Sequence, residues 1–144
     1  MATGVQVVFD CADPDQLAKF WAAALHYKLQ DQPEGYATWE DWLKEHGVPE
    51  ALWNSASAIT DPDGAGPRLY FQQVPEPKSV KNRLHLDLNI SGGPRTPLED
   101  RKQKVEAEVE RLTKIGASQL SRMEQRGEFW IIMADPEGNE FCVH

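Results

Sequence analysis

The feature that most constrains the fold is an internal repeat, because both halves of the 144-residue chain show the same order of predicted elements. Each half reads as a strand, a helix and about three strands, with an Asp-Pro-acid-Gly turn before the last strand. These turns start at Asp61 and Asp135, and 135 − 61 = 74 residues separate them. One βαβββ unit cannot cover its own sheet, so two copies that pack together would bury the apolar face of each. The sequence therefore predicts a single α+β domain, residues 1–144, made of two βαβββ modules.

The first module is predicted at about residues 4–75, and it begins with a β-branched and aromatic strand at residues 5–10. Asp13 and Pro14 then indicate a helix start, since an Asp side chain accepts from unpaired N–H groups and Pro suits the first turn. Apolar residues three and four positions apart continue this helix to Leu25. The remaining predicted elements are a short helix at 39–46 and strands at 28–32, 52–60 and 68–74.

The second module is predicted at about residues 82–144, and its first strand at 83–90 alternates strictly between polar and apolar residues. Because successive side chains of a strand point to opposite faces, His85, Asp87 and Asn89 share one face. Thr96 and Pro97 are typical of a helix start, and Gly116 of a helix end. The other predicted strands of this module are at 117–123, 128–134 and 140–143.

The charge of the chain excludes several classes of partner. With 15 Lys and Arg against 23 Asp and Glu, the net charge is −8, which disfavours binding to nucleic acid or to an anionic membrane surface. No apolar run approaches the ~20 residues of a membrane-spanning helix, and the first residues lack the pattern of a signal peptide. Two cysteines form at most one disulfide. We expect a cytoplasmic protein with reduced thiols and without a nucleic-acid or membrane partner.

Three blocks of sequence resemble the vicinal oxygen chelate superfamily, the glyoxalase/bleomycin-resistance/dioxygenase fold, and in particular its glyoxalase-like branch. They are the Asp-Pro helix start that leads to Phe-Trp at 13–21, Asn-Arg-Leu-His-Leu-Asp at 82–87, and Asp-Pro-Glu-Gly-Asn-Glu-Phe-Cys at 135–142. The resemblance implies that the two modules form a curved mixed sheet around an open cleft, lined by inward-facing strand residues. It also implies a homodimer, in which modules pair within one chain or swap between two.

In the metal-using members of this superfamily, the resemblance implies four ligands from the first and last strands of each module. Gln6 and His85 fall at the two opening positions, and Tyr70 or Gln72 at the third, depending on a register that the sequence leaves open. Cys142 stands where the family pattern has Glu. Because divalent ions prefer carboxylate or imidazole ligands, this set is a poor one. We therefore expect no metal and no other cofactor, with a divalent ion as the alternative.

The candidate ligand-binding residues are polar strand residues and one tryptophan. His85 is the candidate catalytic residue, as a base or as a hydrogen-bonding group. Trp39 is chosen because aromatic walls hold small planar ligands and its segment offers few certain packing partners. The alternatives are a solvated outer face for the polar residues and a small buried apolar role for Cys142. The full set is Gln6, Asp10, Trp39, Tyr70, Gln72, His85, Asp87 and Cys142.

Three classes of function are compatible with these residues. The first is a module that binds a small aromatic or amphipathic molecule in a metal-free cleft, as similarity to the drug-sequestering members implies. The second is a metal-dependent lyase, isomerase or ring-cleaving dioxygenase that uses His85. The third is a regulatory module that uses the acidic predicted helix at 96–116, although such charges are typical of a solvated face. The missing carboxylate at Cys142 favours the first class.

Overall fold

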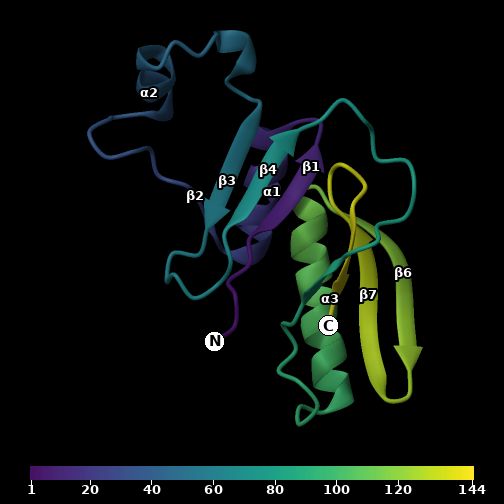
Figure 1. The fold of residues 1–144 in the computed structure, drawn as a ribbon. Coiled ribbons are helices and arrows are strands. Elements are labelled where there is room, and N and C mark those ends of the chain that lie inside the picture. Colours follow the sequence, from purple (N-terminus) through teal and green to yellow (C-terminus); the bar gives the residue numbers. More distant parts are fainter. The chain divides into compact units, whose positions relative to one another are not determined.

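The computed structural model describes residues 1–144, and these divide into two compact units, Met1–Pro77 and Lys78–His144. The first unit holds a four-stranded sheet with the strand order β1-β4-β3-β2, in which β1 and β4 are parallel (Figure 1). Its elements are β1 (Val7–Cys11), α1 (Pro14–Leu25), β2 (Lys28–Leu29), α2 (Trp39–Glu45), a 3-10 turn (Glu50–Leu52), β3 (Ala56–Thr60) and β4 (Leu69–Gln73).

The second unit repeats this topology. Its sheet has the order β5-β8-β7-β6, with β5 parallel to β8 and the other pairs antiparallel. Its elements are β5 (Leu86–Leu88), α3 (Leu98–Lys114), β6 (Ser118–Gln125), β7 (Glu128–Ala134) and β8 (Glu140–Val143). Setting aside the inserted α2 and the 3-10 turn, both units run βαβββ, so the predicted α+β fold with two such modules is confirmed.

Both ends of α1 follow from local chemistry. The Asp13 side chain accepts a hydrogen bond from the Gln16 N–H at 3.1 Å, and Pro14 occupies the first turn, as predicted. The helix ends at His26, whose φ of 58° lies in the left-handed region. Because this left-handed conformation favours glycine, a histidine at this position costs about 1 kcal/mol of backbone strain.

The predicted start of the second long helix is wrong by one residue. Pro97 is the N-cap of α3, and no side chain caps this end. The helix begins at Leu98 instead of Pro97, so the Thr96 hydroxyl is not at the capping position. The Thr96 carbonyl instead accepts a hydrogen bond from Arg101 Nε at 3.1 Å, which satisfies one backbone group near the helix start.

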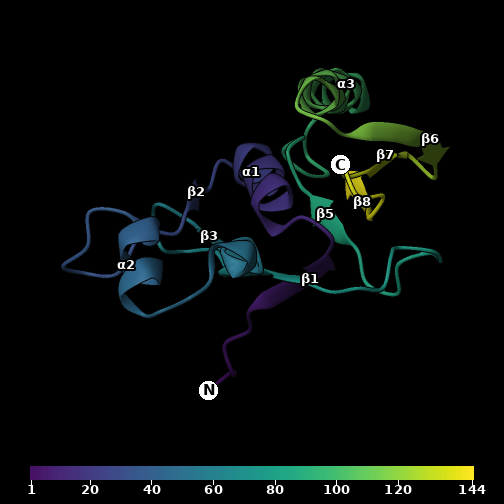
Figure 2. The ribbon, with the colours of Figure 1, turned by 90° about the horizontal axis from the view of Figure 1, so that it is seen from above.

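In each unit, the core lies between one helix and one face of the sheet. In the first unit Phe9 packs between Trp21 of α1 and Phe71 of β4, with ring centroids 5.3 Å apart in both pairs. In the second unit α3 packs on β6, β7 and β8, and Figure 2, where α3 is seen end-on, shows it on one side of these strands. The buried residues of this second core are Val105, Val109, Leu112, Phe129, Ile131, Met133, Phe141 and Val143.

None of the helices has the length and apolar character needed to cross a membrane.

Candidate functional site

The predicted site residues of the strands lie on the sheet face that points away from the helix, here called the helix-free face of each unit. In the first unit, Leu69 and Phe71 of β4 are buried toward α1, so Tyr70 and Gln72 point the other way. In the second unit, Phe141 and Val143 of β8 are buried toward α3, and Cys142 points the other way. On both sheets, strand alternation therefore places the predicted site residues on the helix-free face, as it was predicted to place His85 and Asp87 on one face.

Strand pairing resolves the open register between Tyr70 and Gln72. Val8 pairs with Tyr70 and Asp10 with Gln72, while Asp87 pairs with Cys142. In both units the first bridged pair is apolar and faces the helix, Val7 with Leu69 and Leu86 with Phe141. When these first pairs are matched, Tyr70 corresponds to Cys142 and Gln72 corresponds to His144. Gln6 then corresponds to His85, as the resemblance implied.

The second unit brings His85, Asp87 and Cys142 together. One potential ligand atom from each residue lies within 4.8 Å of the other two. His85 Nε2 is 3.4 Å from Asp87 Oδ1, and both side chains are about half exposed. Asp87 lies on the edge strand β5, His85 directly precedes that strand and Cys142 lies on its neighbour β8, so the parallel pairing of the two strands builds the cluster. The group provides an imidazole, a carboxylate and a thiol.

The Cys142 thiol is held in its neutral form. Burial raises the pKa of the Cys142 thiol above its usual value, and the negative charge of Asp87 raises it further against the smaller opposing effect of Lys81. The residue is only 8% exposed. Because the thiolate is both the nucleophile and the metal ligand, a thiol kept protonated in this way is a weak nucleophile and a weak ligand.

Two residues of this site were missed by the sequence analysis. His144 Nε2 lies 3.6 Å from Asp87 Oδ2, so the carboxylate stands between two imidazoles. The His144 ring stacks on Trp130 of β7, with centroids 6.1 Å apart and planes 15° apart. Trp130 is half-buried on the helix-free face. His144 lies two positions after Cys142, so strand alternation predicts both side chains on the same face. This spacing could have identified the second histidine from the sequence.

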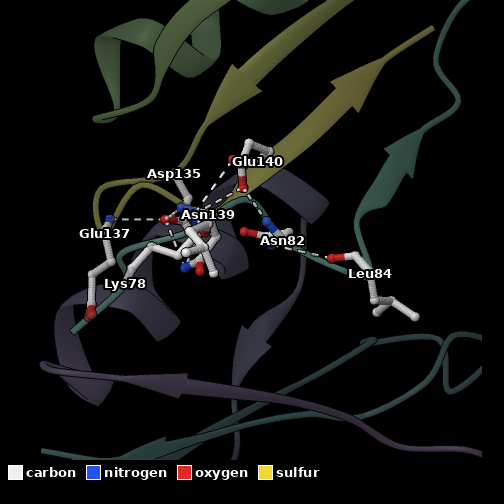
Figure 3. A network of polar contacts seen from close by, with 8 residues as sticks. Lys78, Asn82, Leu84, Asp135, Glu137, Asn139 and Glu140 are labelled. Atoms are coloured by element: carbon white, nitrogen blue, oxygen red, sulfur yellow. Dashed lines mark hydrogen bonds and ion pairs between the residues drawn. The ribbon is translucent and has the colours of Figure 1, made fainter. Parts of the chain in front are cut away.

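A polar network beside the last turn holds the only carboxylate of β8. Glu140 accepts hydrogen bonds from the Asn82 N–H, at 3.1 Å, and from the Lys78 ammonium (Figure 3). Burial would raise the pKa of the Glu140 carboxyl, but the Asn82 N–H and the Lys78 ammonium outweigh it and hold that pKa below its ordinary value. Glu140 is thus engaged with its own neighbours, and it does not replace the carboxylate missing at Cys142.

On the first unit, Gln6 is already bound by a cation. Arg68 Nη1 donates to Gln6 Oε1 at 2.7 Å, and Arg68 Nε donates to Gln30 Oε1 at 2.6 Å. The guanidinium also lies over the Tyr70 ring, 5.3 Å from its centroid. Sequence reasoning missed Arg68, because its position beside Gln6 depends on the parallel pairing of β1 with β4, 62 residues along the chain.

The three other predicted residues of this unit, Asp10, Gln72 and Trp39, make no hydrogen bond or ion pair with the Arg68 guanidinium. Asp10 Oδ1 accepts from Gln72 Nε2 at 2.7 Å, farther along the same pair of strands. Trp39 belongs to α2, where none of the residues is buried. Its indole N–H donates to the Gln30 carbonyl at 2.9 Å, which ties this tryptophan to the residue that holds Arg68.

Comparison with known proteins gives a family and a fold. The family model described as "Glyoxalase-like domain" matches residues 6–144. A search of the curated proteins found no match. Among solved structures, a FosX variant from Listeria monocytogenes has 11% identity and a TM-score of 0.63, with 100% of this chain and 90% of that chain covered.

Two other solved structures are similar to the same extent. FosX from Mesorhizobium loti has 14% identity and a TM-score of 0.60, with 100% of this chain and 92% of that chain covered. A glyoxalase/bleomycin resistance protein/dioxygenase family enzyme from Burkholderia phytofirmans PsJN has 12% identity and a TM-score of 0.60, over 96% of this chain and 94% of that chain. At these identities the likeness concerns the fold.

Proposed function

The chain belongs to the glyoxalase-like domain family, and from this premise we propose that it binds a small aromatic or amphipathic molecule without the help of a metal ion. The observation that carries the proposal is the polar group of His85, Asp87 and Cys142 on the helix-free face of the second sheet. The stacked rings of Trp130 and His144 lie on the same face. Sites for small molecules combine an aromatic surface with a few convergent polar groups in this way.

The neighbouring side chains have distinct roles in such a complex. Trp130 offers a half-buried ring on which an aromatic part of the ligand stacks. Asp87 accepts a hydrogen bond from a hydroxyl or amine of the ligand, while the two imidazoles keep its carboxylate in position. His85 donates or accepts a hydrogen bond at its exposed edge. No covalent step is assigned to Cys142, because its thiol is held neutral.

The donors present do not fit the kind of divalent ion that the fold family uses. Mn²⁺ and Mg²⁺ prefer oxygen ligands, and this cluster has one carboxylate, Asp87, which stands between two imidazoles. The thiol at position 142 has a raised pKa, so its binding of a softer ion is opposed by the proton that must leave. In the first unit, the side-chain oxygen of Gln6 accepts a hydrogen bond from the Arg68 guanidinium. This positive charge opposes the binding of a metal ion to the same oxygen.

A metal-dependent enzyme that uses His85 is the second candidate. The observation that favours it is the short separation of imidazole, carboxylate and thiol, since all three groups are zinc ligands in proteins. Among the structural neighbours, the Listeria FosX variant was crystallised with Mn(II) and 1S,2S-dihydroxypropylphosphonic acid. The two candidates differ in one measurable respect, which is whether ligand binding requires a metal ion.

We also propose that the protein is cytoplasmic and forms a homodimer. A cytoplasmic location is proposed from the low cysteine content, since two cysteines form at most one disulfide. A homodimer is proposed from the resemblance to the superfamily. Size-exclusion chromatography with light scattering tests the second point, and a mass of about 16 kDa for the species in solution would contradict it.

The test of ligand binding uses phenol and benzylamine as probes, in a buffer that contains EDTA. We expect the Trp130 indole N–H and the His85 ring signals to shift saturably in NMR titrations. His85→Ala and Asp87→Asn should weaken binding by about tenfold, since hydrogen bonds to charged groups are worth ~1.5–3 kcal/mol. Gln103→Ala, on the exposed surface of α3, is the matched control and should bind like the wild type. Equal binding by Asp87→Asn and the wild type, or no shift with either probe, would contradict the proposal.

A further inference from the structure

Arg68 is a fixed cation without an anionic partner, on a chain with a net charge of −8. Three other arginines, Arg101, Arg111 and Arg122, each pair with a glutamate. Arg68 has two hydrogen-bond partners, and both are neutral amide oxygens, those of Gln6 and Gln30. Its charge is therefore positioned but not neutralised.

The two amides leave the Nη2 edge of the guanidinium without a hydrogen-bond partner. An arginine has five N–H donors, and here Nε and one hydrogen of Nη1 are used. Three donors remain, one on Nη1 and two on Nη2, and the oxygens of a carboxylate or a phosphate accept hydrogen bonds from such groups. Since Gln6 and Gln30 already hold the side chain, an anion that binds there does not have to immobilise a flexible arginine.

An aromatic and apolar surface adjoins this edge. The guanidinium lies over the Tyr70 ring, and Val8, the strand partner of Tyr70, is 49% exposed. Ala58 of β3 pairs with Tyr70 on its other side, so small and apolar side chains flank the ring. The indole of Trp39 is tied to Gln30. A ligand that carries its charge at one end and an apolar body at the other matches this arrangement of Arg68 and Tyr70.

We propose that Arg68 is an anion-binding residue, which takes the carboxylate or phosphate group of a small organic acid whose apolar part lies over Tyr70. The juxtaposition that carries this is a guanidinium fixed by two glutamine amides above an aromatic ring. The site lies within the first unit and uses none of the residues proposed for ligand binding on the second. Anion binding at Arg68 and ligand binding at the His85 cluster can therefore be tested separately.

The decisive variant is Gln6→Glu, which has nearly the same shape and places a carboxylate on the Arg68 guanidinium. The internal ion pair should preserve the fold while it occupies the anion site. The probes are benzoate, phenyl phosphate and the neutral amide benzamide, followed through the Arg68 Nε–H signal and the Tyr70 ring signals in NMR titrations. For the wild type we expect saturable shifts with at least one anion and none with benzamide.

Gln6→Glu should lower the affinity for the anion at least about tenfold, and Arg68→Lys should lower it less, because the charge stays and the paired donors are lost. Gln103→Glu adds the same charge on exposed α3 and should leave the affinity unchanged. Tighter binding of benzoate identifies a carboxylate ligand, and tighter binding of phenyl phosphate identifies a phosphate ligand. Benzamide binding as well as benzoate, unchanged affinity in a folded Gln6→Glu protein, or no response to either anion would overturn the proposal.

Discussion

At matching positions, the helix-facing sides of the two sheets carry the same kind of residue, whereas the helix-free sides do not. Val7, Leu69 and Phe71 in the first unit correspond to the apolar residues Leu86, Phe141 and Val143 in the second. On the other side, Gln6 corresponds to His85, Tyr70 to Cys142 and Gln72 to His144. Burial against a helix restricts one side to apolar residues. The same βαβββ framework therefore tolerates two different sets of polar groups.

The charges of the two helix-free faces differ most at the start of the last strand. Arg68 in the first unit corresponds to Glu140 in the second, so a cation stands where the other unit has an anion. Glu140 is neutralised by Lys78, whereas Arg68 donates hydrogen bonds to two neutral amides and has no anionic partner. This difference indicates that the second unit uses its charge to hold its own chain together, while the first unit keeps a charge available for a ligand.

The largest expected effect separates the two faces of one strand. Phe141→Ala should lower the free energy of unfolding by about 3–5 kcal/mol, because it leaves a cavity under α3. Cys142→Ser, the next residue along β8, should lower it by only about 1 kcal/mol, because this change leaves no cavity and the Asp87 carboxylate lies near the new hydroxyl. Urea denaturation of both variants measures the difference. Equal losses would show that the two faces are not distinct in the way described.

A second prediction concerns metal affinity. Cys142→Glu places a carboxylate next to Asp87 and His85, so Mn²⁺ or Zn²⁺ should bind at least about tenfold more tightly than to the wild type. Tyr70→Glu, at the corresponding position of the first unit, should gain less, since Arg68 is its neighbour. Calorimetric titration of both variants checks this. An unchanged affinity in a folded Cys142→Glu protein would mean that the missing carboxylate does not limit metal binding.

The pH dependence of stability follows from Glu140. Its pKa is lowered in the folded chain, so the folded state binds its proton less readily than the unfolded state does. The stabilisation is therefore present above the ordinary pKa of a glutamate, ~4.3, and is lost as the pH falls through the lower folded value. Glu140→Gln should flatten the acid side of a stability curve recorded by thermal denaturation between pH 6 and pH 3. A curve as steep as that of the wild type would exclude this role.

The smallest effects concern two residues with a positive φ, one in each unit. His26 ends α1 in the left-handed region, and Arg126 precedes Gly127 in the two-residue turn between β6 and β7, where both residues have positive φ. His26→Gly and Arg126→Asn should each raise the free energy of unfolding by about 0.5–1 kcal/mol. Thermal denaturation measures both changes. A loss of stability in either variant would mean that its side chain makes contacts worth more than the strain.

The structural features that the sequence predicts correctly depend on local patterns. The Asp13 cap and the alternation of His85 with Asp87 involve neighbours in the chain, and the order of elements reveals the repeat. The partners of Arg68 and the approach of His144 to Asp87 depend on strands that are distant in sequence. Such contacts require the register, which a single sequence leaves open. Trp130 was not among the predicted site residues, and its alternation with buried Ile131 turns it to the helix-free face.

The most direct test of the central claim is a pair of phenol titrations of the wild-type protein, one with EDTA and one with added Zn²⁺ or Mn²⁺. The affinity at the Trp130 and His85 signals is the quantity compared. If the cluster around Asp87 holds a ligand through its own side chains, the two affinities agree. Binding that appears only after the metal is added would contradict that claim and would make the chain a metal-dependent member of its family.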